Sequence, residues 1–471
     1  MVWEDKRTKM TIIALLAAGL IVRFYFYFGH VFSDDAYYSY LAHTLYSGEF
    51  GADYLGYPVC LVRKGISALT AISFFLFGTN EASATVFPMI FSFLNMILAY
   101  TATKVITRSE ISSVIVLLLT AFYPTEVLFA SIAFTDMFSA FFINSGILLL
   151  FMADRDKKYS YSVLSGLLFF ISVLFKINVF YTSILLSALF IFVLIKKRSL
   201  NLYIFISLSV LVLGIMLEGY AYYLSNGDFF YRLTVMSSYS DFSKHDFAQS
   251  SGMTLMLENF TAVFLRRTMI FIPLIAVLQL VINRKERKNR LVVYWFSGLL
   301  ILYLFFTMSL SEYKLIPLRF TWYLFPLFLP SMMVASKLIS SLKKGWMVLS
   351  LAGYIVFSLY MTQHFRTYFD LENAELFRHA VKAEPDMIIY TDHFTKYSID
   401  LIDGYKKPSR TVRLNHEMKR SISANSLAVY HSGHTSELNK QGFDYPDEEY
   451  FINNGFEEIN RFGSFVIYEK K

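Results

Sequence analysis

Eleven long apolar runs constrain this 471-residue chain more than any other feature of its sequence. A helix needs about 20 mainly apolar residues to cross the hydrocarbon core of a bilayer. The runs lie at 10–29, 82–103, 110–123, 134–152, 160–175, 178–195, 201–224, 262–282, 291–310, 320–340 and 345–363. The third run is short, and we expect it to extend toward its neighbour. The sequence therefore predicts an α-helical polytopic membrane protein with about 11 transmembrane helices.

The overall composition agrees with a membrane protein. Hydrophobic residues make up 55% of the chain and charged residues only 17%, whereas about a quarter of the residues of a soluble domain are charged. We attribute the net charge of +7 to basic loops at the membrane rather than to a nucleic-acid-binding surface. Nucleic acid is therefore not expected as a partner.

The distribution of Lys and Arg predicts the orientation of the chain. If the N-terminus is cytoplasmic, the inner segments hold 18 Lys and Arg in 45 residues, whereas the outer segments hold 7 in 116. The sequence RKERKNR at 284–290 is the strongest inner anchor. Because cytoplasmic loops carry the excess of basic residues, we expect a multi-pass plasma membrane protein. Its active site and its tail from residue 364 are predicted to be extracytoplasmic.

Two domains are predicted. Residues 1–363 form a transmembrane domain, and residues 364–471 form a small soluble extracytoplasmic α/β domain. In this tail, the runs DMIIYT, TVRL, SLAVYHS and SFVIYEK are typical of strands, and AELFRHAVKAE and EEYFINNGFEEI are typical of helices. The lone Cys60 excludes an internal disulfide, so the tail must depend on its apolar core. No chemistry is assigned to the tail, because it has no glycine-rich phosphate loop and no clustered acid pair.

The first outer segment, 30–81, is long and is expected to contain two surface helices. The sequence DDAYYSYLAHTLYSG has an apolar stripe with helical spacing and ends at Gly48. The sequence YPVCLVRKGISALTAISFFLFG has Pro58 near its start and Gly78 at its end. We expect this second helix to lie along the membrane surface. Long segments on one face of a bundle are where functional sites tend to lie.

Three acidic residues on the predicted outer face are candidates for catalysis. Asp34 and Asp35 begin the first surface helix, where a carboxylate can act as a general base. The pair is also a candidate site for a divalent cation, Mg²⁺ or Mn²⁺, held against a phosphate. Helix capping is the alternative, since negative charge is favourable at a helix N-terminus. Asp136 begins the fourth span, where an acid is either functional or a boundary residue that reaches water.

Six basic residues lie on the same predicted side, where the positive-inside rule disfavours them. They are Arg63, Lys64, Lys176, Arg266, Arg267 and Arg319. A donor phosphate held at the outer interface would explain all six. Nonspecific contact with membrane lipid headgroups would explain any one of them equally well.

Five short passages carry a family resemblance. They are SDDAYYSYLA, GYPVCLVRKGISALTAISFFLFGTNEASA, AFYPTEVLFASIAFTDMF, SVLFKINVF and LRFTWYLFPLFLP. In this order they resemble motifs of the membrane glycosyltransferases of the C superfamily, of the protein O-mannosyltransferase and aminoarabinose-transferase type. Two positions depart from the family pattern: Asp35 stands where Glu is commoner, and Tyr57-Pro58 stands where Pro-Pro is usual. The resemblance covers most of residues 1–340 and leaves the tail out.

The resemblance implies transfer of a sugar from a polyprenyl-phosphate carrier to an acceptor hydroxyl outside the membrane. It implies inversion, with Asp34, the first acid of the family signature, as the general base. The acceptor is a lipid, a glycan or a protein. Two alternatives stay open. One is a transporter or flippase of lipid-linked sugars, which typically has charges near the bilayer midplane and broken helices in paired halves. The other is a glycan ligase that uses a diphosphate carrier.

Overall fold

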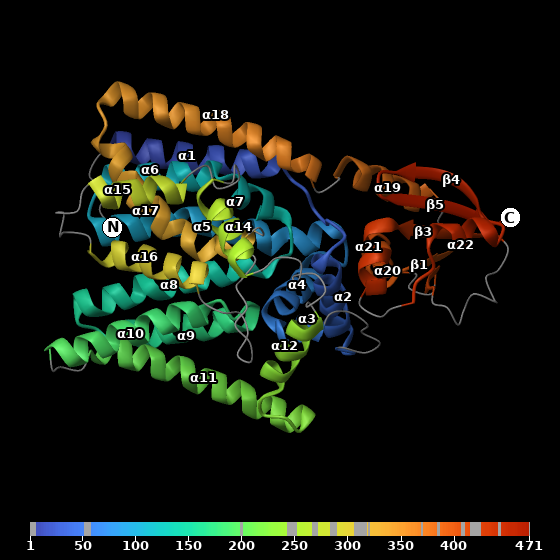
Figure 1. Cartoon of the computed structure of the whole chain (residues 1–471), viewed down its shortest axis with the longest axis horizontal. Helices are drawn as coiled ribbons and strands as arrows, with labels where there is room; N and C mark the ends of the chain where they lie inside the picture. Colours follow the sequence, from blue (N-terminus) through green and yellow to red (C-terminus); the bar gives the residue numbers. More distant parts are fainter. Residues whose placement is uncertain are drawn as a thin grey trace.

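The computed structural model describes residues 6–50, 58–197, 201–242, 252–265, 272–282, 290–305, 318, 321–368, 371–383, 387–406, 410–414, 425–440 and 444–470. Most of the long helices run along the long axis of the molecule (Figure 1). A small domain that contains the strands lies at one end, beside α2 (Asp34–Ser47).

Each predicted apolar run overlaps at least one helix. The longer helices are α1 (Lys6–Tyr25), α5 (Glu81–Thr107), α8 (Thr135–Asp156), α10 (Val179–Lys197), α11 (Leu202–Asn226) and α18 (Lys344–Tyr368). The shorter ones are α6 (Glu110–Phe122), α9 (Tyr159–Phe175), α14 (Gly252–Phe264), α15 (Ile272–Ile282), α16 (Arg290–Phe305) and α17 (Phe325–Ser341). By length and composition, 6 helices among the described residues could each cross a membrane. The polytopic helical fold is therefore confirmed, and the total of eleven spans stays a prediction.

The short third run continues as a broken helix. α6 ends at Phe122, and α7 (Pro124–Leu128) leads into the 3-10 turn η1 (Phe129–Ser131). The two parts are bent by 53°. Proline has no backbone N–H and clashes with a preceding helical turn, so Pro124 begins a new helix instead of continuing α6.

The first outer segment contains the predicted helices in a modified form. α2 ends at Gly48, whose φ of +85° lies in the left-handed region that glycine adopts most readily. The second predicted helix is divided into α3 (Pro58–Val62) and α4 (Lys64–Phe77), with Arg63 at the break. α4 leaves Phe75 and Leu76 exposed, and its position along the membrane surface stays a prediction.

The tail folds around a five-stranded mixed sheet with the strand order β2-β1-β3-β5-β4. The strands are β1 (Ile388–Thr391), β2 (Thr411–Arg413), β3 (Ser426–His431), β4 (Glu457–Phe462) and β5 (Phe465–Lys470). β1 pairs in parallel with β2 and β3, whereas β5 pairs antiparallel with β3 and β4. The predicted α/β class of the tail is therefore confirmed.

Two layers of helices flank this sheet. α19 (Leu371–Ala383) and α20 (His393–Ile402) contribute to the apolar core on one face, and α22 (Glu448–Asn453) contributes to the core on the other. α20 and α21 (Ser432–Lys440) were not predicted from the sequence. α18 runs past the predicted domain boundary at 363 to Tyr368.

The helix predicted over EEYFINNGFEEI is wrong at its end. α22 stops at Asn453, and Gly455 turns the chain with a φ of +80° into β4. β4 is an edge strand with mostly exposed residues. Charged residues are common on edge strands because they discourage pairing with other chains. The sequence of β4 therefore lacks the apolar pattern that marks a strand.

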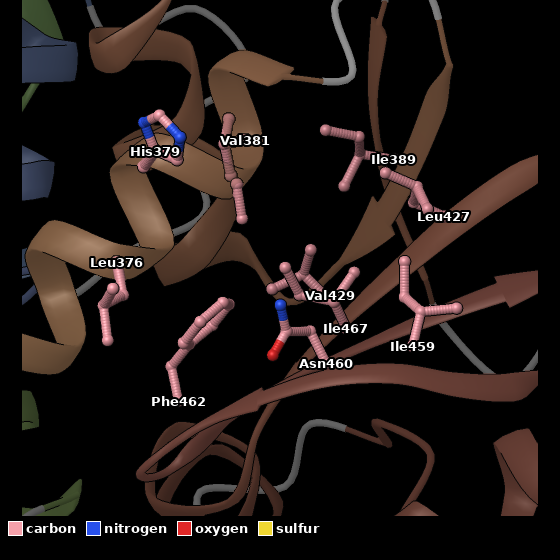
Figure 2. Close-up of a pocket in the computed structure, with 11 residues that line it drawn as sticks. Leu376, His379, Val381, Ile389, Leu427, Val429, Ile459, Asn460, Phe462 and Ile467 are labelled. Carbon is pink, nitrogen blue, oxygen red and sulfur yellow. The ribbon is translucent and has the colours of Figure 1, made fainter.

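An apolar cavity of about 380 Å³ lies between α19 and the sheet. Figure 2 shows Leu376 and Val381 of α19 on one side of it, and Ile389 and Leu427 of the sheet on the other. Every residue that lines this cavity belongs to the tail, and none of the lining residues is acidic. The cavity is therefore separate from the carboxylates of the first outer segment.

Candidate functional site

Asp34 is the first residue of α2 and the central carboxylate of the candidate site. Its side chain is partly exposed, and within the described ranges its oxygens accept no hydrogen bond and form no ion pair. Burial raises the pKa of Asp34, and the nearby cations Arg63 and Lys176 partly offset that rise. An accessible carboxylate with a raised pKa is suited to general-base catalysis.

Asp35 holds the loop that precedes α2. Its carboxylate accepts hydrogen bonds from the backbone amides of Val31 (2.6 Å) and Ser33 (2.8 Å), and it lies 2.9 Å from His30 Nδ1. Burial alone would raise the pKa of Asp35, but the histidine and the two amides outweigh burial and lower it. Only 1% of the residue is exposed. The two neighbouring acids therefore have different surroundings.

Asp136 and Lys176 form a buried ion pair. Lys176 Nζ donates a hydrogen bond of 2.6 Å to Asp136 Oδ1, and the two residues are 7% and 1% exposed. Lys176 Nζ also lies 4.0 Å from the centre of the Tyr323 ring. Asp136 begins α8 and Lys176 follows α9. The structure thus brings together two residues that were predicted separately, within electrostatic range of Asp34.

Arg63 lies at the break between α3 and α4, within electrostatic range of Asp34 and of Lys176. Its Nη1 donates a hydrogen bond of 2.7 Å to the hydroxyl of Tyr38. Tyr38 lies four residues after Asp34 on α2, so the two side chains share a helix face. We define the candidate site as Asp34 with the flanking groups Tyr38, Arg63, Asp136, Lys176 and Tyr323.

Lys64 faces a different neighbour. Its Nζ lies 4.2 Å from the centre of the Tyr222 ring on α11. The charges of Glu218 and Arg232 also act on the Lys64 ammonium group. These two residues form an ion pair, with Arg232 Nη2 2.5 Å from Glu218 Oε1. Successive residues of a helix point about 100° apart. Adjacent positions at the start of α4 therefore direct Arg63 toward the candidate site and Lys64 toward α11.

Arg266, Arg267 and Arg319 lie outside the described residues. Their predicted contacts with a donor phosphate stay predictions.

The predicted divalent-cation site at Asp34 and Asp35 has a limited set of ligands. Mg²⁺ requires several oxygen ligands in a near-octahedral arrangement. Both oxygens of Asp35 accept hydrogen bonds from its own loop, which leaves Asp34 as the accessible carboxylate of the pair. Across the part of the chain that the structure describes, no three His, Cys, Asp or Glu side chains gather in a way that could hold a metal. A divalent cation held by both acids therefore stays a prediction.

A further buried charge was not predicted. Arg23 in the last turn of α1 is fully buried and donates hydrogen bonds to Ser92 Oγ (2.6 Å) and to the carbonyl of Ala121 (2.9 Å). In the predicted orientation this turn is the outer end of α1, so Arg23 is on the same side as Asp34.

Sequence reasoning also missed His30, Tyr38 and Tyr323. The position of Tyr38 one turn after Asp34 was a usable signal, because residues four apart share a helix face. His30 and Tyr323 gave no such signal, because their roles depend on partners that are distant in the sequence or on the local fold of a loop.

Comparison with known proteins gives a match at the level of fold. No protein-family model and no curated protein matches this sequence. The solved structures of ArnT from Cupriavidus metallidurans, in the apo state and bound to undecaprenyl phosphate, each match with a TM-score of 0.61 and 13% identity over 97% of both chains. The oligosaccharyltransferase of Archaeoglobus fulgidus in the apo form matches with a TM-score of 0.54 and 12% identity, over 85% of this chain and 64% of that one. AglB of the same organism, in complex with an inhibitory peptide and a dolichol-phosphate, matches with a TM-score of 0.53 and 10% identity, over 99% and 75% of the two chains.

These matches show that the chain shares the fold of ArnT and AglB, in agreement with the predicted resemblance. They also extend it. The sequence motifs left the tail out, whereas the match with ArnT covers 97% of both chains and so includes most of the tail. The soluble domain is therefore part of the shared architecture.

Proposed function

We propose that this chain is a membrane glycosyltransferase that moves a sugar from a polyprenyl-phosphate carrier to an acceptor hydroxyl on the extracytoplasmic face, with inversion. One observation carries the proposal: Asp34 presents an accessible carboxylate beside two cations, Arg63 and Lys176. The fold supports it, because two of the matching structures contain undecaprenyl phosphate and a dolichol-phosphate. The partners of the chain are then the lipid-linked donor, the acceptor and the surrounding membrane lipids.

In the proposed step, the acceptor oxygen attacks the anomeric carbon of the sugar from the face opposite the phosphate. The new bond to the acceptor forms as the bond between the anomeric carbon and the phosphate oxygen breaks, and the electron pair leaves with the phosphate. Asp34 takes the proton of the acceptor hydroxyl. Inverting glycosidases follow the same stereochemical logic, with the activated nucleophile and the leaving group on opposite faces.

The cations stabilise the leaving phosphate. Its negative charge grows as the glycosidic bond breaks, and preorganised positive groups in a water-poor site stabilise that charge without rearranging. Arg63 is held by Tyr38, and Lys176 is held by Asp136 and the ring of Tyr323. Both cations are therefore fixed in place before the donor binds.

A labelled polyprenyl-phosphate sugar tests the function directly. We expect the purified protein to release polyprenyl phosphate in the presence of acceptor. A transporter would release none, and a ligase would need a diphosphate carrier. Mass spectrometry of surface glycans, lipids and proteins, with and without this protein, identifies the sugar and the class of acceptor.

The predicted topology can be tested by labelling single cysteines in intact cells. In a Cys60→Ser background, Ser237→Cys in α12 (Tyr231–Phe242) and Ser432→Cys in the tail are expected to react with an impermeant thiol reagent. Asp154→Cys, at the exposed C-terminal end of α8, serves as the matched inner control and is expected to react only after lysis. Labelling of the first two positions only after lysis would contradict the orientation and an extracytoplasmic site.

Replacing Arg63 with Ala is expected to weaken binding of undecaprenyl phosphate about 10- to 100-fold, because a charge-assisted contact is worth roughly 1.5–3 kcal/mol. Fluorescence or calorimetric titration of the detergent-solubilised protein measures this affinity. Lys64→Ala is the matched control, since Lys64 is adjacent in sequence but faces Tyr222. Equal losses for both variants would indicate a general electrostatic effect instead of a phosphate contact at Arg63.

A further inference from the structure

The tail domain contacts both α2, which begins with Asp34, and the loop before it. The first of these contacts is made by Phe32 in the loop. This residue is 2% exposed and lies in the apolar core beneath α19. Its ring centre is 5.4 Å from that of Phe377 and 5.6 Å from that of Phe465. Its φ of +58° is uncommon for a residue with a β-carbon. A side chain from the membrane domain thus completes the core of the soluble domain, two residues before Asp34.

A second contact lies three residues after Asp34. The hydroxyl of Tyr37 is 2.8 Å from His393 Nε2, and His393 Nδ1 is 2.8 Å from the hydroxyl of Tyr445. Burial lowers the pKa of His393 to about 4, so the ring is neutral at pH 7. A neutral imidazole has one donor and one acceptor nitrogen, and here each one faces a tyrosine hydroxyl. Tyr37 and His393 are both essentially buried.

A third set of contacts holds the loop before α2. His30 Nδ1 lies 2.9 Å from Asp35 Oδ2. The other ring nitrogen, Nε2, lies 3.2 Å from Ser398 Oγ of α20. Arg378 of α19 donates to the carbonyl of His30 and to Glu81 Oε1, the latter at 2.7 Å. The loop is therefore tied to the tail through both a side chain and a backbone carbonyl.

The contacts continue along one face of α2. The ring of Tyr40 stacks on that of Tyr397 with centres 4.2 Å apart. The ring of His43 stacks on that of Tyr405 with centres 4.1 Å apart and an angle of 4° between the planes. Residues 37, 40 and 43 share this face because they are three positions apart. The aromatic stripe of α2 thus packs on the soluble domain.

We propose that the tail domain is a clamp that positions Asp34 for catalysis, with Phe32, Tyr37 and His393 as positioning residues. This inference rests on the function proposed above. Asp34 lies between two anchored points of the chain, so the orientation of its carboxylate depends on the docked tail. Arg63 and Lys176, by contrast, are held by contacts within the membrane domain. Loosening the clamp therefore affects the chemical step more than donor binding, since a misplacement of about 1 Å can cost about 10²-fold in rate.

Hydrogen exchange and steady-state kinetics of the full-length protein in nanodiscs test the clamp together. Phe32→Ala and His393→Phe are expected to speed amide exchange across residues 30–41 and to lower kcat about 10- to 100-fold, with the donor KM changed by less than about 3-fold. His393→Gln keeps a side-chain donor and acceptor and is expected to restore part of kcat. Tyr450→Phe, a tail tyrosine of α22 on the other face of the sheet, is the matched control and is expected to match the wild type.

The Tyr37–His393 pair provides a test that does not depend on an intact apolar core. Because the two residues share one hydrogen bond, the double variant Tyr37→Phe/His393→Phe is expected to lose less activity than the two single losses combined. Unchanged exchange and unchanged kcat in these variants would overturn the clamp. If the wild-type protein transfers no sugar but amide exchange across residues 30–41 is faster in these variants, the proposed function is overturned. The clamping of α2 by the tail then still stands.

Discussion

Replacing Asp34 with Asn is expected to slow sugar transfer by about 10²- to 10⁴-fold, the usual contribution of a general base. Asn keeps the size of the side chain and is favoured near helix N-termini, but it cannot take the proton of the acceptor. Within the described residues, the Asp34 carboxylate has no hydrogen-bond or ion-pair partner to lose. Folding is therefore expected to survive, and thermal unfolding in detergent together with turnover of a labelled donor measures both properties.

Asp35→Asn is the matched comparison, because the two acids are adjacent and differ in their surroundings. Asp35 accepts hydrogen bonds from two amides and contacts His30, so its replacement is expected to lower the melting temperature as well as the rate. If Asp34→Asn keeps near-normal turnover in a well-folded protein, the base lies elsewhere. Asp136 is then the next candidate, and Asp34 is a helix cap.

The pH dependence of the reaction gives an independent check on the same residue. A general base must be deprotonated, and burial raises the pKa of Asp34 above that of an ordinary aspartate. We therefore expect kcat/KM to fall as the pH drops through this raised pKa, earlier on acidification than an ordinary aspartate would cause. The acid limb should be absent from the residual activity of Asp34→Asn. A limb that persists unchanged in the variant would belong to another group.

Replacing Lys176 with Ala is expected to destabilise the protein by about 3–5 kcal/mol, the usual cost of leaving one partner of a buried ion pair uncompensated. Asp136 would lose its 2.6 Å hydrogen bond while remaining buried. Transfer should also slow, because a cation of the proposed phosphate site is removed. Thermal unfolding and donor titration separate these two effects.

The double variant Lys176→Met/Asp136→Asn is the control for this prediction. Removing both charges together is expected to recover much of the stability, because no unpaired buried charge remains. Donor affinity should stay low, because the cation is still missing. A double variant that binds undecaprenyl phosphate normally would assign Lys176 a purely structural role and leave the donor phosphate to other cations.

The sequence by itself determined the membrane fold and placed the candidate acids at the starts of α2 and α8. Whether a segment favours the bilayer depends on its own length and apolarity, so every predicted run overlaps a helix. The two acids at the start of α2 and the aromatic stripe that follows them were likewise visible in the local sequence. β4, by contrast, was missed because a charged edge strand has no distinctive local pattern.

Only the tertiary structure decided which acid is accessible and what the tail does. The partner of Asp136 is Lys176, 40 residues away, and the partner of Tyr37 is His393, 356 residues away. Three acids that look alike in the sequence therefore separate into an ion-paired one, a loop-holding one and an accessible one. Ionisation and orientation depend on burial and on nearby charges and dipoles, and chain folding brings these together from distant segments. The local pattern predicts a carboxylate at the start of α2, and the packing around it decides whether that carboxylate can accept a proton.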